Sequence, residues 1–218
     1  MLPENVASLA AEGISLTDYA AVVGGMTFLS LFVWQGVGVL LFVLRSNDWM
    51  AMLVSLFLIV FSTASFSSGL TDFVATAYSR LEQPLIALNV LGEFLITAFF
   101  LLFPNGRIVP RWLWWLLIAR PVLAATDYLP DLMLQDMAYF LMFFPMIGLM
   151  LLAQIYRYRR VSSPIEKQQT RWVLFGTLFG VITFLIIILV GALTTFADNS
   201  WSRAQLISLL LMYLAMSA

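Results

Sequence analysis

Two charged residues interrupt apolar stretches of the sequence and are the first candidates for chemistry. Glu93 lies in the stretch 84–103, and Arg120 lies in the stretch 112–126. A charge in hydrocarbon is costly, so such residues usually face other helices and pair with one another. Counted from the helix ends, both lie roughly 10–13 Å deep at about 1.5 Å per residue. We expect an intramembrane Glu93–Arg120 ion pair, serving as a structural pin or as a ligand- or proton-sensitive switch.

Small polar and small apolar residues supply two weaker candidate sites. Ser62, Ser65 and Ser68 fall in the second half of one apolar stretch. They are expected either to form interhelical hydrogen bonds or to line an outward-facing pocket. Gly176 and Gly180 form a GxxxG pattern, which permits close approach of two helices. We interpret that pair as a packing feature.

The residue types that are missing exclude several kinds of chemistry. The chain has no cysteine and no histidine. Disulfides, thiol nucleophiles, Cys/His zinc sites and His-ligated haem are therefore excluded. The sequence also lacks a P-loop, a GxSxG, an HExxH and paired intramembrane carboxylates. We predict that these residues are not an enzyme, bind no cofactor or metal, and have no nucleic-acid partner.

The elements that carry these residues are expected to be membrane-spanning helices. The chain has 218 residues, of which 62% are hydrophobic and 11% are charged, whereas a soluble domain is about a quarter charged. About 18 apolar residues in a row are enough to cross a bilayer. The prediction is an all-α, polytopic bundle of about seven helices, in residues 19–218 after a polar leader at 1–18. The expected spans are 19–44, 49–69, 84–103, 112–126, 137–156, 172–193 and 203–218.

Three of these spans have particular features. The stretch 112–126 is short and contains Arg120-Pro121, so it could instead be re-entrant or strongly kinked. The run Ser163-Pro164-Ile165-Glu166 matches a capping box with proline at the first helical position, so this helix is expected to begin near Ser163. The last stretch is still apolar at Ala218, and we expect a longer protein that continues past it.

The positive charges predict the orientation in the membrane. One alternating set of loops holds eight Lys or Arg residues and the other holds two. Because basic loops remain in the cytoplasm, the N-terminus is predicted outside and the C-terminus inside. Much of this charge lies in one stretch, for which topogenic charge with attraction to anionic lipid and a relay to an output domain are both open interpretations. The residues of that stretch are Arg157, Arg159, Arg160, Glu166, Lys167 and Arg171.

Two stretches resemble a known family when they are taken together. They are FPNGRIVPRW at 103–112 and YRYRRVSSPIEKQQTRWV at 156–173. As a pair they resemble the N-terminal membrane sensor region of bacterial, ComP-like sensor histidine kinases, which are frequent in Chloroflexi. The resemblance covers roughly 19–218, and the helices between the two stretches match only in hydropathy.

The resemblance implies a multi-pass sensor of a two-component system in the bacterial plasma membrane. In that family a cytoplasmic helix pair with the phosphorylated histidine and an ATP-binding domain follow the membrane region. A homodimer, an unidentified extracellular or membrane-embedded ligand, and a response regulator reached only through the kinase domain are the implied partners. The present chain ends before any kinase residue. Two other functions stay open, a small transporter or permease subunit and a stand-alone membrane assembly subunit.

Overall fold

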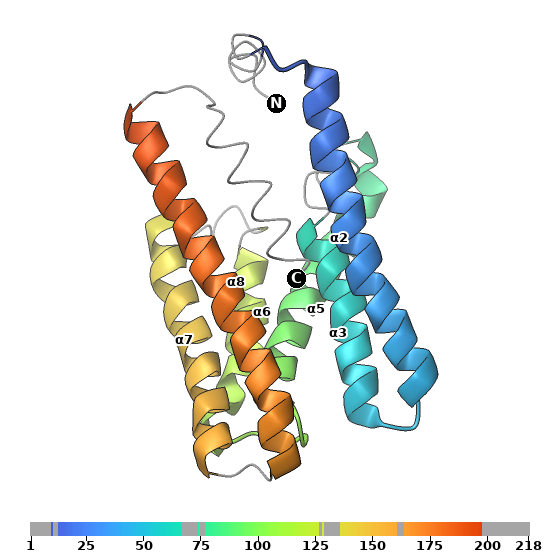
Figure 1. The fold of residues 1–218 in the computed structure, drawn as a ribbon, viewed down its shortest axis with the longest axis vertical. Helices are drawn as coiled ribbons and strands as arrows, with labels where there is room; N and C mark the ends of the chain where they lie inside the picture. Colours follow the sequence, from blue (N-terminus) through green and yellow to red (C-terminus); the bar gives the residue numbers. More distant parts are fainter. Residues whose placement is uncertain are drawn as a thin grey trace. The chain divides into compact units, whose positions relative to one another are not determined.

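The computed structural model describes residues 10, 13–66, 74, 77–126, 128, 136–160 and 164–197. Every regular element in this part of the chain is a helix, which confirms the all-α expectation at that level. Figure 1 shows these helices, coloured along the sequence. The elements are α2 (Leu16–Arg45), α3 (Trp49–Phe66), α5 (Ser79–Leu102), the 3₁₀-helix η1 (Arg111–Trp115), α6 (Leu116–Thr126), α7 (Asp136–Arg160) and α8 (Pro164–Ala197).

Among the described residues, three helices are long and apolar enough to cross a membrane. They are α2, α5 and the Leu141–Arg160 part of α7, while the apolar helix Trp49–Ser65 is shorter. The described residues therefore contain three of the expected crossings by length and composition, and the expected span 203–218 lies outside the described residues.

The structure of the expected span 112–126 bears on its open alternative, a re-entrant or strongly kinked segment. It consists of the 3₁₀-helix η1 followed by α6, which has 11 residues and contains Pro121. A helix of 11 residues rises about 17 Å, well short of a hydrocarbon core about 30 Å thick. α6 by itself is therefore shorter than a bilayer core is thick.

Helix ends differ from the predicted ends where local capping decides them. α2 begins at Leu16, inside the expected leader, because the Ser15 hydroxyl accepts a hydrogen bond from the Asp18 amide at 3.0 Å. α5 begins at Ser79, five residues before the expected start, with Pro84 inside it. α8 begins at Pro164, as the capping pattern predicted, and Ser163 lies outside the described residues.

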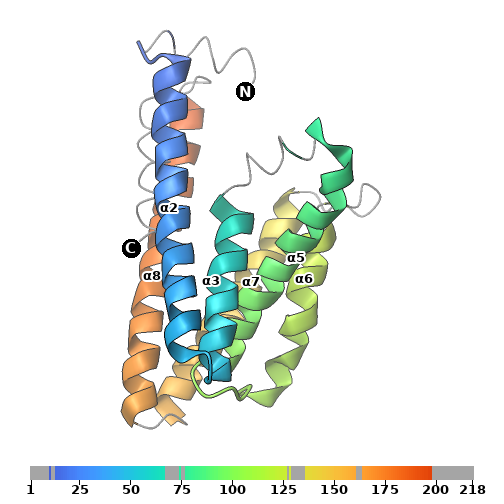
Figure 2. The ribbon, with the colours of Figure 1, turned by 90° about the vertical axis from the view of Figure 1, so that its right-hand side faces the viewer.

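The chain divides into two compact units, residues 1–33 with 175–218, and residues 34–174. Within the first unit, the Thr27 hydroxyl donates to the Val23 carbonyl in α2 at 2.9 Å. In the second unit, α5 packs against α3, α6 and α7 (Figure 2). The ring centroids of Phe57 and Phe99 lie 4.9 Å apart in a stacked arrangement, and this α3–α5 contact lies in the hydrophobic core.

Candidate functional site

The structure brings Glu93 and Arg120 together. The Nη2 group of Arg120 on α6 donates to the Oε2 atom of Glu93 on α5. The Arg120 side chain is 3% exposed and the Glu93 side chain 20% exposed. The guanidinium carbon also lies 4.6 Å from the centroid of the Phe143 ring on α7, within the range of a cation–π contact. One arginine thus connects three helices.

Arg120 keeps unused hydrogen-bonding capacity. Its Nε and Nη1 atoms are buried and have no hydrogen-bond partner among the described residues. A buried donor without a partner costs about 1–3 kcal/mol, so this contact is less favourable than a fully satisfied one. Protonation of Glu93, or an anionic group reaching Arg120, would change the electrostatic balance at the junction of the three helices.

A second polar site lies at the end of α5, and we name it the carbonyl clasp. Gln154 and Arg157 of α7 donate from their side chains to backbone carbonyls at this end, and both residues are buried, with relative exposures of 0% and 1%. The carbonyls that accept from Arg157 are those of Leu101, Phe103 and Arg107, and those that accept from Gln154 are those of Phe100 and Phe103.

The clasp satisfies groups that any helix leaves unpaired. The last carbonyls of an α-helix have no partner within the helix, and α5 ends at Leu102 because Pro104 cannot continue it. The C-terminal end of a helix also carries partial negative charge, which favours a cation there. Arg157 supplies both the donors and the positive charge.

A tight turn follows the end of α5. The Arg107 amide donates to the Asn105 side-chain oxygen at 3.2 Å, and Gly106 has φ +75°. A Cβ at Gly106 would lie 2.0 Å from the Trp49 ring. Both the backbone conformation and the space therefore require glycine at this position.

The turn is connected to the start of α8. The Asn105 side-chain amide donates to the Oε1 atom of Glu166 at 3.3 Å, and Glu166 lies in the first turn of α8. Together with the clasp, this bond joins residues 103–107 to Arg157 and Glu166. These are parts of the same two stretches whose sequences carried the family resemblance.

Several residues of this site could not be identified from their sequence context. Asn105 and Gln154 were not among the candidates, and Arg157 was expected to be a topogenic or relay residue but is buried. The i, i+3 spacing of Gln154 and Arg157 within a long helix is a signal that both side chains lie on one face. By contrast, the remaining basic candidates are exposed, namely Arg159, Arg160, Lys167 and Arg171.

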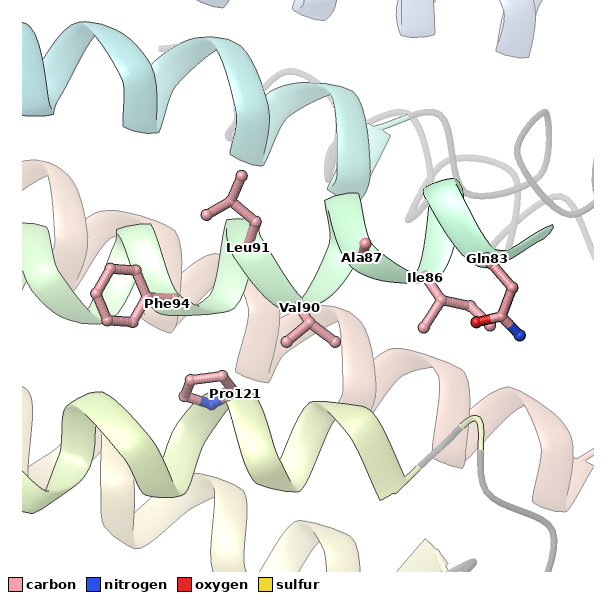
Figure 3. Close-up of a pocket in the computed structure, with 7 residues that line it drawn as sticks. All are labelled: Gln83, Ile86, Ala87, Val90, Leu91, Phe94 and Pro121. Atoms are coloured by element: carbon pink, nitrogen blue, oxygen red, sulfur yellow. The ribbon is translucent and has the colours of Figure 1, made fainter. Parts of the chain in front are cut away.

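Ser62 and Ser65 do not line the groove that lies between α5 and α6. Ser62 is buried, and its hydroxyl donates to the Ile59 carbonyl at 3.1 Å. Ser65 is partly buried in α3, and Ser68 lies outside the described residues. The groove, of about 480 Å³, runs between α5 and α6, with Pro121 facing α5 (Figure 3). Its lining residues are Gln83, Ile86, Ala87, Val90, Leu91, Phe94 and Pro121.

The glycine candidates both lie in α8. A Cβ at Gly176 would meet no atom within 4 Å, so no described neighbour approaches it closely. Gly180 follows one turn later in the same helix.

Comparisons with known proteins add no family to this description. The chain matches no protein-family model, no curated protein and no solved structure.

Proposed function

We propose that this chain is the membrane sensor region of a bacterial two-component signalling protein. In this proposal about seven helices cross the plasma membrane, with the N-terminus outside and the C-terminus in the cytoplasm. A kinase domain beyond residue 218 receives the signal. The three long apolar helices support a membrane location. The charge distribution between the loops supports the orientation.

The observation that carries the proposal is the connection between the two resembling stretches. About fifty residues separate Phe103 from Arg157 in the sequence, yet the Arg157 guanidinium donates to the Phe103 carbonyl. The Asn105–Glu166 hydrogen bond adds the start of α8. Basic residues that only set the orientation in the membrane need no hydrogen bonds to other helices. A unit that couples the movement of one helix to that of another does need such bonds.

The geometry suggests a route for the signal along α5. Glu93 and Leu101 lie on this helix eight residues apart, or about 12 Å along its axis. A stimulus that breaks the Glu93–Arg120 pair frees α5 to shift against α6 and α7. Because three carbonyls at the end of α5 and in its following turn are bound by Arg157, such a shift must rearrange the clasp and, through Asn105, the start of α8. In this proposal the clasp and the Asn105–Glu166 bond exchange between two hydrogen-bonded arrangements.

The first experiment is to read the gene past codon 218. The proposal predicts an open frame that continues into a cytoplasmic helix with a histidine and then an ATP-binding domain. A stop codon within a few residues would contradict it and would favour a stand-alone membrane subunit.

A second experiment then tests the route in the full-length protein. Autophosphorylation in membrane vesicles should change several-fold in the Glu93→Gln variant. It should stay at the wild-type level in Glu82→Gln, which removes an exposed carboxylate from the first turn of the same helix. Equal activity in both variants, with both folded, would remove the ion pair from the mechanism.

A further inference from the structure

Exposed cations gather at the clasped end of the 34–174 unit. They come from three segments, the turn after α5, the end of α7 and the first two turns of α8, which lie at the same end (Figure 1). All of their side chains are exposed. The residues are Arg107, Arg159, Arg160, Lys167 and Arg171.

The clasp is what brings these three segments together. Arg157 binds the carbonyl of Arg107, and Arg159 and Arg160 follow Arg157 within one turn. Glu166 accepts from Asn105 and is followed directly by Lys167. The carboxylate within this group, that of Glu166, is thus already engaged by the turn, while the surrounding cations extend into solvent.

The cations lie at the level where a bilayer would place its headgroups. Two of the apolar helices end here, α5 at Leu102 and the Leu141–Arg160 part of α7 at Arg160. Trp112, Trp114 and Trp172 lie close by in the sequence and are 58%, 56% and 71% exposed. Tryptophan prefers the boundary between hydrocarbon and water. The exposed tryptophans and the helix ends therefore indicate the same interfacial plane.

We propose that this surface binds the phosphate groups of anionic phospholipids in the bilayer. Guanidinium groups match phosphate oxygens in geometry and charge, and clustered cations next to membrane helices attract anionic headgroups. The site needs the three segments to be held together, so the clasp builds it without Arg157 itself touching the lipid. This inference does not depend on whether the chain is a sensor.

Native mass spectrometry of the purified chain in detergent tests the proposal. Phosphatidylglycerol is titrated against wild type and against the Arg107→Gln/Lys167→Gln variant, with phosphatidylcholine as the uncharged comparison. Each cation near a membrane surface contributes about fivefold to the affinity for anionic lipid, so the double variant should bind phosphatidylglycerol about 25-fold more weakly. Phosphatidylcholine binding should not change between the two proteins.

A control variant and a second pair of substitutions complete the experiment. Arg80→Gln removes an exposed cation from the first turn of α5, near the opposite end of that helix, and should bind phosphatidylglycerol like wild type. Arg159→Gln/Arg160→Gln provides an independent second pair, which should also lose affinity. Wild-type affinity in both double variants, or an equal loss in Arg80→Gln, would overturn the proposal. Displacement of the lipid by an equal concentration of glycerol 1-phosphate would instead identify a site for soluble phosphates and overturn the lipid assignment.

Discussion

The guanidinium of Arg157 on α7 donates to the backbone carbonyl of Phe103, the residue that caps α5. A side chain of one helix thereby closes the end of another. The same side chain also holds the carbonyls of Leu101 and Arg107. The position of α5 along α7 is therefore fixed by directional hydrogen bonds in addition to apolar packing.

Replacing Arg157 should destabilise the fold strongly. Arg157→Met keeps much of the apolar length but leaves three buried or part-buried carbonyls without their charged donor, at a cost of about 3 kcal/mol. Arg157→Lys keeps the charge without the planar fork and should recover less than half of that loss. Unfolding in mixed detergent measures both variants. Arg159→Met is the matched control because Arg159 is exposed on the same helix, and a change as large as that of Arg157→Met would contradict the clasp.

The turn at Gly106 should tolerate no side chain. Gly106→Ala should cost about 2 kcal/mol, from the positive φ and from the collision with the Trp49 ring. In the Trp49→Ala background the same substitution should cost only about 1 kcal/mol, since the collision is removed and the backbone cost stays. A double-mutant cycle of unfolding free energies measures the difference. Equal costs in the two backgrounds would show that the ring does not lie over Gly106.

Breaking the ion pair one residue at a time should cost more than removing both charges together. Glu93→Gln leaves Arg120 buried without its counter-charge, and Arg120→Gln removes the counter-charge of the partly buried Glu93. Each should lose about 3 kcal/mol in unfolding free energy. The double variant should be less destabilised than the sum of the two single variants, because no charge remains unpaired. Additive losses would mean that the two side chains do not interact in the membrane.

The pair and the clasp differ in how far the sequence reveals them. Glu93 and Arg120 stand alone in apolar stretches joined by a short turn, so each has few other candidate partners. Arg157 belongs to the run Arg157-Tyr158-Arg159-Arg160. The first arginine of this run is buried and the other two are exposed. Its partners are backbone carbonyls, which have no signature in the residue types. Only the placement of α7 against the end of α5 reveals them.

The start of a helix can likewise be predicted only where residues next to it in the sequence decide it. The start of α8 at Pro164 could be predicted because capping-box chemistry is local. The start of α5 could not be predicted in this way. Pro84 is typical of the first residue of a helix, but the polar turn from Ser79 to Gln83 before it is helical too. For 112–126, composition indicates an apolar stretch, while Pro121 and the 3₁₀ turn at Arg111–Trp115 leave an α-helix too short to cross.

The orientation in the membrane can be measured with single-cysteine variants, since these 218 residues contain no cysteine that would have to be removed first. In intact cells, a membrane-impermeant maleimide should label Arg80→Cys and should leave Arg159→Cys unlabelled. After the cells are opened, both should react, since both side chains are exposed. The reverse pattern would place the basic loops outside and contradict the proposed topology.

The central claim is that the two stretches form one unit in the membrane-embedded protein, and cross-linking tests it most directly. The variant Asn105→Cys/Glu166→Cys should be joined within the chain by a short, membrane-permeant bismaleimide in native membranes, since the ends of the two natural side chains lie 3.3 Å apart. The matched control Arg80→Cys/Glu166→Cys joins α8 to the first turn of α5, far from the clasp along that helix, and should not cross-link. Efficient cross-linking of the first pair alone is the predicted result. Failure of that pair, or equal cross-linking of both, would contradict the account.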